Sequence, residues 1–400
     1  MAEITEDELR TRVRAFLAGM PDDADMFAFR GAQFDAGLAV VHFPEGKGGL
    51  GLSPKMQGVV ADELRSSPHS YHDLAVNPIG IGMGMPTVLT HGTDEMHERF
   101  LRPCFTGEEI WCQLFSEPGA GSDVAGLASK AELDGDEWIV NGQKVWTTLA
   151  HRSRWGMLVA RTDPDQPKHK GLSYFVIDMH ADGVETRPLY QITGEAEFNE
   201  VFMTDVRIPD SMRLGERGDG WRVAITTLMN ERVALGGGGS PRGGGAIALL
   251  TDVWEKNQPP ADSPEYTVWR DRVADLWVKA EVLRLTTARA RVAAQVGVPG
   301  PEGSVGKLMS AELNKDIFEA VLDLHGADGM IFEAGYPLER AENAAMYTID
   351  NKKSFLRSRA NSIEGGTSEV MRNILGERVL GLPGDIRVDK DIPWTEVPRN

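Results

Sequence analysis

Residues 112–126 read Cys-Gln-Leu-Phe-Ser-Glu-Pro-Gly-Ala-Gly-Ser-Asp-Val-Ala-Gly, a small-residue turn that follows an apolar run. The glycines of this turn allow the main chain to approach a ligand closely, and Ser116 and Ser122 add rotatable hydroxyl donors. This composition suits an anionic, planar ligand that lies against backbone N–H groups. A turn that binds nothing is the alternative, because most Gly-rich turns only reverse the chain.

The segments around this turn have the two-residue period of β-strands. The β-forming runs are Trp138–Asn141, Trp155–Arg161, Leu172–Asp178 and Asn199–Ile208. Asp134-Gly135-Asp136 lies between two such runs and indicates a hairpin. We therefore expect a β-rich middle domain over residues 111–215.

Both flanks have helical periodicity instead. Leu9, Val13 and Phe16 recur at helix spacing near the N-terminus, and the apolar positions between Val273 and Leu283 recur in the same way. We expect a helical N-terminal domain over 1–110 and a helical C-terminal domain over 216–385. A charged, poorly ordered tail is expected over 386–400.

The composition restricts the partners and the compartment. The chain has 400 residues and a net charge of −18, which disfavours binding to nucleic acid or to an anionic membrane surface. It has no run of about eighteen apolar residues that would predict a membrane span. The acidic N-terminus does not resemble a secretion signal, and Cys104 and Cys112 form neither a disulfide framework nor a zinc motif. We expect a soluble cytoplasmic protein.

A charged pair interrupts the apolar stripe of the helix that is predicted after Gly220. The apolar stripe of that helix is formed by Trp221, Ile225, Leu228 and Leu235. Arg232 falls near the middle of the stripe and Glu231 at its edge, where charges without partners would be costly to bury. The two residues form either a structural ion pair or a functional one, in which desolvation makes Glu231 a general base.

A second polar motif, Ser362–Asn373, ends a loop and begins an amphipathic helix, for which Thr367 is the expected N-cap. Gly365 and Gly366 leave backbone N–H groups at the helix start, where a partial positive charge can meet an oxyanion or a phosphate. A capped helix without any ligand is equally compatible with this pattern.

Trp146, Thr147 and Thr148 follow a strand-like run. Trp146 could stack on an aromatic ring system, although a lone Trp at a strand end more often belongs to the core. His151, His169 and His325 do not have the spacing of metal ligands, so no metal site is predicted.

Three motifs in this order resemble the acyl-CoA dehydrogenase family: Leu114–Asp123, Val145–Thr148 and Gly365–Arg372. The resemblance covers nearly the whole chain. It implies an α+β fold with an all-helical N-terminal domain, a β-barrel-like middle domain and a C-terminal four-helix bundle. It also implies noncovalent FAD, an acyl-CoA substrate, α,β-desaturation, and an electron-transfer flavoprotein as the electron acceptor.

The resemblance also implies cofactor contacts. The flavin and its diphosphate would be held by Phe115, Ser116, Gly121 and Ser122, and Ser122 would also lie near the CoA pantetheine. The isoalloxazine ring would be flanked by Trp146 and Thr148.

From the C-terminal domain, Thr367 and Glu369 would approach the cofactor. The stretch from Asp323 to Ala327, which includes Gly326, would reach the adenosine of a neighbouring subunit.

The catalytic base departs from the commonest family pattern, which places it immediately before the Gly-Thr pair. Gly365 occupies that position here, and Glu364 is one residue out of register. A minority of the family, including isovaleryl- and long-chain acyl-CoA dehydrogenases, places the base before an Arg on a C-domain helix, where this chain has Glu231 and Arg232. The resemblance therefore implies that Glu231 removes the pro-R α-proton, with Glu364 as the fallback. The backbone N–H of Gly365 would stabilise the enolate, and Arg232 would support the CoA or the base.

A second departure concerns assembly. Most members have an Arg-x-x-Phe-Gly segment that reaches a neighbour's FAD, but residues 261–270 read Ala-Asp-Ser-Pro-Glu-Tyr-Thr-Val-Trp-Arg. The patterns of residues 147–151 and 363–367 are similar to those of bacterial enzymes for bulky acyl-CoAs such as steroid side chains, some of which are two-gene heterotetramers. A homodimer or homotetramer and a heterotetramer are thus both open. A non-catalytic or half-site subunit and an acyl-CoA oxidase are the alternative functions.

Overall fold

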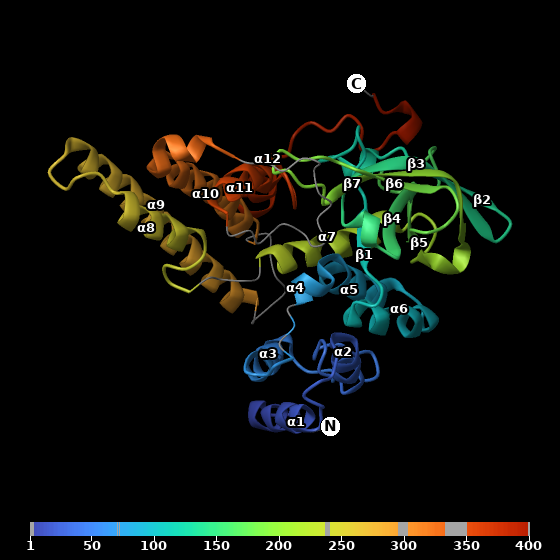
Figure 1. Ribbon diagram of the computed structural model, residues 1–400. Helices are drawn as coiled ribbons and strands as arrows, with labels where there is room; N and C mark the ends of the chain where they lie inside the picture. Colours follow the sequence, from blue (N-terminus) through green and yellow to red (C-terminus); the bar gives the residue numbers. More distant parts are fainter. Residues whose placement is uncertain are drawn as a thin grey trace.

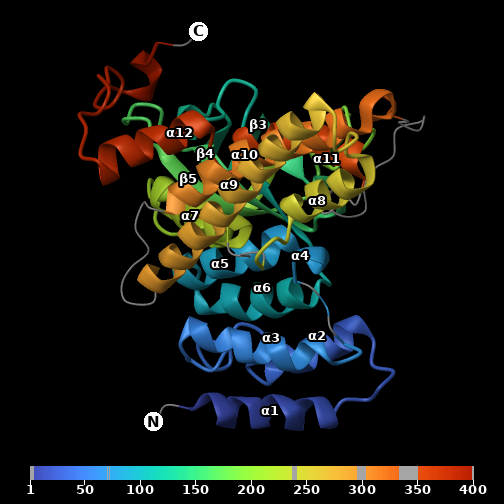
Figure 2. The same cartoon turned by 90° about the vertical axis from the view of Figure 1, so that its left-hand side faces the viewer.

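The computed structural model describes residues 4–69, 71, 73–236, 241–294, 303–332 and 350–398. It consists of a group of helices at the N-terminal end, a sheet, and a second group of helices (Figures 1 and 2). The predicted α+β class and the order of a helical, a sheet-containing and a helical part are therefore confirmed.

The N-terminal part is helical because its segments carry apolar faces and local caps. Its described α-helices are α1 (Glu6–Ala18), α2 (Met26–Asp35), α3 (Gln57–Arg65), α4 (Asp73–Val76), α5 (Met85–His91) and α6 (Asp94–Thr106). Helix α1 begins with a capping box, in which the Glu8 amide donates to Thr5 Oγ1 over 3.3 Å and the Thr5 amide donates to the Glu8 carboxylate over 2.8 Å. Phe100 and Phe105 of α6 pack in the core that covers one face of the sheet.

The middle part is one eight-stranded sheet. Its strands are β1 (Trp111–Leu114), β2 (Lys130–Asp134), β3 (Glu137–Thr148), β4 (Trp155–Arg161), β5 (Leu172–Asp178), β6 (Val184–Pro188), β7 (Phe198–Pro209) and β8 (Arg213–Leu214). They lie in the order β6-β7-β3-β2-β4-β5-β8, with β1 paired in parallel with β4. Gly135, at a φ of 69°, turns the predicted β2–β3 hairpin.

Both faces of strands β4 and β5 are covered, which explains why their sequences are continuous apolar runs. Met157 and Val159 of β4 join the core beneath the N-terminal helices. Leu158 and Ala160, which alternate with them, face a second core formed with residues of β3 and β7. The two halves of the sheet therefore enclose an apolar interior, as a barrel-like domain requires.

The C-terminal part is helical again, and α10 is its centre. Its described α-helices are α7 (Gly220–Gly236), α8 (Ala246–Asn257), α9 (Pro264–Ala294), α10 (Gly303–His325), α11 (Asn351–Ser358) and α12 (Ser368–Ile374). Apolar side chains of α8, α9 and α10 form one core, and α10 also contacts α11 and α12.

Helix α7 lies where the three parts meet, since it contacts α5, the strands β4 and β5, and α10 (Figure 1). The apolar stripe predicted for this helix was wrong in part, because Ile225 is 38% exposed. The buried face is formed by Val223, Ala224 and Thr227. Glu231 is four residues after Thr227 and continues this face.

Candidate active site

The loop that follows β1 is held from beneath by a buried ion pair. Lys144 of β3 donates to Glu117 Oε1 over 2.8 Å and to the Phe115 carbonyl over 3.0 Å. The Glu117 carboxylate also accepts the amides of Ala128 at 2.7 Å and Ser129 at 2.9 Å. Burial acts to raise the pKa of Glu117, but the Lys144 charge and these hydrogen bonds outweigh it and hold the pKa below its ordinary value. The loop therefore starts and ends at one charged anchor.

The opposite side of this loop is open. Gly121, Ser122 and Asp123 are exposed, and no atom lies within 4 Å of the position that a Cβ of Gly121 would occupy. Phe115 differs, because its side chain is buried and packs edge-on against Tyr174, with ring centroids 5.8 Å apart. Of the predicted cofactor contacts in the loop, Phe115 can thus offer only its main chain, whereas Gly121 and Ser122 present an accessible surface.

Trp146 has an unusual conformation for a bulky residue. Its φ is 61°, its side chain is 60% exposed, and the β3–β7 register shifts between Lys144 and Thr147. A β-bulge of this kind changes the direction of a side chain. A positive φ strains the backbone of a bulky residue such as Trp, and strain of this kind often marks a functional site. The alternative that Trp146 belongs to the core is therefore wrong. Beside it, Thr148 is half-buried, and the buried Oγ1 of Thr147 has no hydrogen-bond partner within the described residues.

The first loop is coupled to Trp146 by the main chain. The Val145 amide donates to the carbonyl of Ser116 over 2.9 Å. Ser116 is half-buried and lies directly before the anchored Glu117. The loop and the bulge therefore form one rigid wall, whose exposed groups are the Trp146 ring and the open glycine-rich turn.

Contacts across the sheet continue from this wall to the second motif. The Trp146 and Phe198 rings pack edge-on with centroids 5.9 Å apart, and the Arg357 guanidinium carbon lies 5.7 Å from the Phe198 centroid. Arg357 of α11 donates to Glu364 over 2.8 Å, and its Nε lies 3.5 Å from the buried Glu197 carboxylate. The structure thus connects Trp146 with the Ser362–Asn373 motif.

The Glu364 carboxylate is tethered on both oxygens. Oε2 accepts from Arg357, and Oε1 accepts from the side-chain amide of Asn361 over 2.7 Å. Burial acts to lower the pKa of Arg357, but the charges of Glu364 and Glu197 outweigh it, so that this pKa lies above its ordinary value. Glu364 is therefore part of an interdomain ion-pair network.

The loop after Glu364 has a backbone that favours glycine. Gly365 and Gly366 have φ angles of 62° and 93°, and a Cβ on Gly366 would lie 2.6 Å from the Met371 methyl group. The amide of Gly365 makes no hydrogen bond to any described residue. Thr367 caps α12 as predicted and accepts the Val370 amide over 3.1 Å. Glu369 is exposed and pairs with Arg372 one turn later, at 3.1 Å.

Glu231 belongs to α7, which contacts α10. It is half-buried on the continuation of the α7 buried face. Burial lowers the pKa of Lys307 of α10 below its ordinary value, while the negative charges of nearby carboxylates, Glu364 and Glu231 among them, act in the opposite direction. Lys307 also donates to the Gly366 carbonyl, and its helix α10 contacts α7, so α10 connects the helix of Glu231 with the glycine loop. The side chain of Arg232 is outside the described residues.

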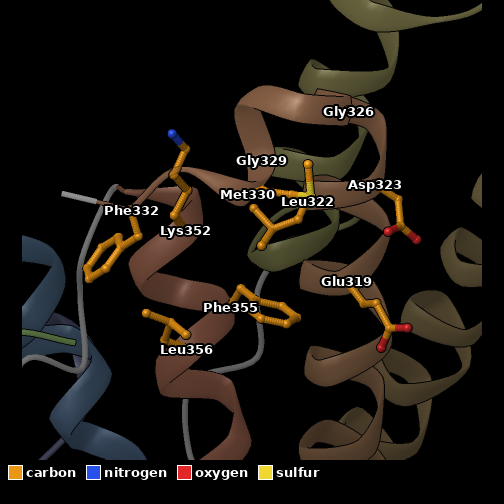
Figure 3. A pocket seen from close by; sticks show the side chains of 10 residues that line it. All are labelled: Glu319, Leu322, Asp323, Gly326, Gly329, Met330, Phe332, Lys352, Phe355 and Leu356. Carbon is orange, nitrogen blue, oxygen red and sulfur yellow. The ribbon is translucent and has the colours of Figure 1, made fainter. Parts of the chain in front are cut away.

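A cavity of about 710 Å³ opens at the far end of α10 (Figure 3). It is lined by Glu319, Leu322, Asp323, Gly326, Gly329, Met330, Phe332, Lys352, Phe355 and Leu356. Asp323 is paired with Arg272 at 2.8 Å, and Gly326 adopts a φ of 58°. At 1.5 Å per residue of helix, Asp323 lies roughly 24 Å along α10 from Lys307. The predicted adenosine residues are thus well separated from the glycine loop of the same chain.

The C-terminal tail was predicted to be poorly ordered, and this was wrong for Asp389 and Trp394, which contact the first loop or its partner Lys168. Lys168 bridges Asp123 of the loop at 2.8 Å and Asp389 of the tail at 2.5 Å. The Trp394 indole donates to the Gly126 carbonyl over 3.2 Å, and the Arg161 guanidinium lies over the Trp394 ring. Asp389, one of the charges that suggested a disordered tail, instead pairs with Lys168 of the segment between β4 and β5.

The described residues contain no group of three or more His, Cys, Asp and Glu side chains arranged to hold a metal ion. No helix among them has the length and apolar character that crossing a membrane would require.

Sequence profiles of three domains match consecutive parts of the chain. Residues 2–108 match the acyl-CoA dehydrogenase N-terminal domain, residues 112–206 its middle domain and residues 218–380 its C-terminal domain.

Two curated relatives from Mycobacterium tuberculosis are similar in sequence. Acyl-CoA dehydrogenase IpdE1 is 38% identical over 352 residues, which cover 88% of this chain and 86% of IpdE1. Acyl-CoA dehydrogenase FadE34 is 39% identical over 370 residues, which cover 92% of this chain and 47% of FadE34. The chain thus spans about half the length of FadE34.

Two solved structures are similar over almost their full length. The Tcur3481-Tcur3483 steroid ACAD has 26% identity and a TM-score of 0.71, with 95% of this chain and 98% of that chain covered. The ChsE4-ChsE5 complex from Mycobacterium tuberculosis has 26% identity and a TM-score of 0.69, with 96% and 100% covered.

Proposed function

The chain belongs to the acyl-CoA dehydrogenase family, and from this premise we propose that it catalyses FAD-dependent α,β-desaturation of an acyl-CoA thioester. The proposal rests mainly on a series of side-chain contacts that runs from Trp146 through Phe198 and Arg357 to the glycine loop. These contacts join a wall suited to a planar ring with a loop whose Gly365 amide has no hydrogen-bond partner among the described residues. Helix α7, which carries Glu231, contacts α10, whose Lys307 bonds to this loop.

The residues present fit FAD. Trp146 is strained and exposed beside the open turn at Gly121, and the Thr147 hydroxyl is buried without a partner among the described residues. We propose that Trp146 and Thr148 flank the isoalloxazine ring and that Ser116, Gly121 and Ser122 hold the ribityl and diphosphate groups through main-chain and hydroxyl donors. When bound, FAD supplies the acceptor for the hydride that leaves the β-carbon.

Glu231 is the proposed base, because Glu364 is already engaged by two hydrogen bonds. The Glu231 carboxylate would take the α-proton, and the Gly365 amide would hold the thioester oxygen as enolate charge develops there. Glu364 remains the fallback base. A thioester α-proton is too weakly acidic to be removed without such stabilisation, so the base and the amide have to act on one substrate.

The remaining contacts of the site are proposed from the family resemblance. Ser122 and Arg232 would contact the CoA part of the substrate. Thr367 and Glu369 would approach FAD from the C-terminal part. The cavity at Asp323 and Gly326 would receive the adenosine of a FAD whose flavin lies in a neighbouring subunit, which agrees with the separation along α10.

The assembly is proposed to be oligomeric. Val278, Val282 and Leu285 are exposed at successive turns of α9, and a stripe of this kind is typical of a helix that packs on another subunit. One similar structure is titled a complex of ChsE4 and ChsE5, so a heteromeric partner of related fold is proposed beside a second copy of this chain. Another is titled a steroid ACAD, which supports a bulky acyl group as the substrate class.

The test begins with the purified protein. Flavin absorbance near neutral pH, followed by ferricenium reduction with short, long, branched and steroid acyl-CoAs, is expected to show turnover with at least one bulky substrate. A colourless protein without turnover would contradict the proposal.

Two control measurements separate the alternative functions. Flavin and activity that appear only after co-expression with a related subunit would establish the half-site alternative. Peroxide release in air that matches substrate consumption would establish an oxidase, whereas reduction of an electron-transfer flavoprotein without peroxide is the proposed outcome.

A further inference from the structure

Lys307, on the first turns of α10, spans the glycine loop. Its Nζ donates to the Asn361 carbonyl over 3.0 Å and to the Gly366 carbonyl. These two carbonyls lie on either side of Glu364 and Gly365 in the chain, so one ammonium group ties together the beginning and the end of the loop. The loop conformation, and with it the position of the Gly365 amide, therefore depends on a side chain from another helix.

The surroundings of Lys307 are strongly anionic. The carboxylates whose charges act on it come from the elements packed around it and are Glu231 of α7, Glu364 of the loop, Glu369 of α12 and Glu312 of α10 itself. Cations partner three of them: Arg357 bonds to Glu364, Lys315 to Glu312 and Arg372 to Glu369. Glu231 is the fourth of these carboxylates and is the base proposed above.

The bonding of Lys307 is unusual for a lysine among carboxylates. An ammonium group has three N–H donors, and two of them are used on neutral carbonyls. Lys307 is also half-buried, so its charge is screened less than that of a surface lysine. A residue that only neutralised an acidic cluster would be expected to bond directly to a carboxylate. The geometry instead combines a backbone clamp with a nearby positive charge.

We infer that Lys307 is a positioning residue for proton abstraction, which fixes the Gly365 amide and keeps the Glu231 carboxylate ionised. The inference rests on the proposed function. It gives Lys307 two separable actions. The clamp requires hydrogen-bond donors of suitable length, whereas the effect on Glu231 requires only a positive charge, because an opposite charge within several ångströms favours the ionised form of a carboxylate.

The test compares Lys307→Met, Lys307→Gln and Lys307→Arg. In the Met variant kcat is expected to fall about 30-fold or more with KM changed less than about threefold, because the loss concerns the transition state. The acidic limb of its kcat–pH profile is expected to move up by about one pH unit. The Gln variant should show the same pH shift with a smaller loss of kcat, and the Arg variant should restore the acidic limb.

Controls separate folding from positioning. Lys130→Met removes an exposed lysine that pairs with Glu132 at 2.8 Å, and it is expected to leave kcat, KM and the pH profile unchanged. Flavin absorbance and the unfolding temperature are measured for every variant. If Lys307→Met does not fold, the Gln and Arg variants still test the inference, because their predicted pH profiles differ.

The outcomes for the inference and for the proposed function differ. Absence of acyl-CoA turnover in the wild-type protein, or full activity of Glu231→Gln, would overturn the proposed function. If the wild type is active and Glu231→Gln is not, a wild-type acidic limb in both Lys307→Met and Lys307→Gln would overturn only the inference. Equal pH shifts in the Gln and Arg variants would overturn it as well, because they would show that charge is not involved.

Discussion

The two glycine loops of the site are held in different ways. The loop after β1 rests on the buried pair Glu117–Lys144, and both partners belong to the middle part of the chain. The loop at Gly365 is held by Arg357 of α11 and Lys307 of α10, and Arg357 also lies 3.5 Å from Glu197, directly before β7. The buried anchor of the first loop is therefore complete once the sheet has folded, whereas the second loop exists only when sheet and helices are docked.

This difference suggests a division of roles. A loop built within one part can bind a cofactor tightly and without rearrangement. A loop held by charges from several elements can respond to substrate and to its neighbours. Five predictions test the comparison, from the largest expected effect to the smallest.

Glu231→Gln is expected to lower kcat by about a thousandfold or more, because general-base catalysis by a positioned group contributes up to about four orders of magnitude. Flavin content should remain that of the wild type, since Glu231 is on α7 and not in the loop after β1. Steady-state assays with ferricenium and flavin absorbance check both parts. A variant that also lost flavin would break the separation between the two loops.

Lys144→Met is expected to destabilise the protein by about 3–5 kcal/mol, because it leaves Glu117 buried without its cation. Flavin binding should weaken at the same time, since the loop loses its anchor. Urea unfolding and flavin titration measure the two effects.

The double variant Glu117→Leu with Lys144→Met is the control for charge burial. It is expected to recover much of the stability but not the flavin affinity, because no charge is left unpaired and no anchor is rebuilt. A double variant less stable than Lys144→Met would contradict this account of the anchor.

Trp146→Ala is expected to weaken flavin binding about tenfold, which corresponds to about 1.4 kcal/mol, with little loss of stability because the side chain is largely exposed. Trp146→Gly should bind flavin as weakly but unfold at a slightly higher temperature, since glycine relieves the positive φ. Isothermal titration and thermal unfolding distinguish the two variants. Unchanged flavin affinity in both variants would show that Trp146 does not contribute to flavin binding.

Glu364→Gln is expected to keep kcat within about threefold of the wild type and to reduce stability by about 1–2 kcal/mol, because a charge-assisted hydrogen bond to Arg357 is lost. The same assays as for Glu231→Gln measure it. If Glu364→Gln lost turnover while Glu231→Gln stayed active, Glu364 would be the catalytic base instead of Glu231.

Asp389→Asn is expected to change the unfolding free energy by less than about 1 kcal/mol, because Lys168 keeps its bond to Asp123 and the pair lies near the surface. The Lys168 hydrogen bond holds the pKa of Asp389 below its ordinary value, so this small contribution is present above the pKa of a free aspartate and is lost as the pH falls through the folded value. Thermal unfolding of the wild type and of Asp389→Asn, at pH 7 and at acidic pH, measures this difference. A loss of more than about 1 kcal/mol at pH 7 would show that the tail contributes more to stability than predicted.

Local patterns were sufficient for much of the fold. The strands β4 and β5 begin and end at the residues predicted from their apolar runs, and Thr367 caps its helix as its sequence indicated. These features depend on neighbours in the chain. The stripe of α7 was predicted only in part, because Ile225 faces outward at a junction of three parts that no local pattern reveals.

The site was harder to predict for the same reason. Glu231, Trp146 and Gly365 were selected from motifs, but the residues that hold them together were missed. Arg357 and Lys307 come from elements far away in the sequence, and only the packed structure brings them to the loop. The positive φ of Trp146 and the docking of the tail on Asp123 likewise depend on the assembled sheet.

Anaerobic stopped-flow reduction of the bound flavin by an acyl-CoA tests the central claim most directly, because it isolates proton abstraction and hydride loss from reoxidation. The account predicts that the wild type and Glu364→Gln bleach the flavin absorbance rapidly, whereas Glu231→Gln binds substrate but bleaches at least about a thousandfold more slowly. Rapid bleaching in Glu231→Gln would contradict it.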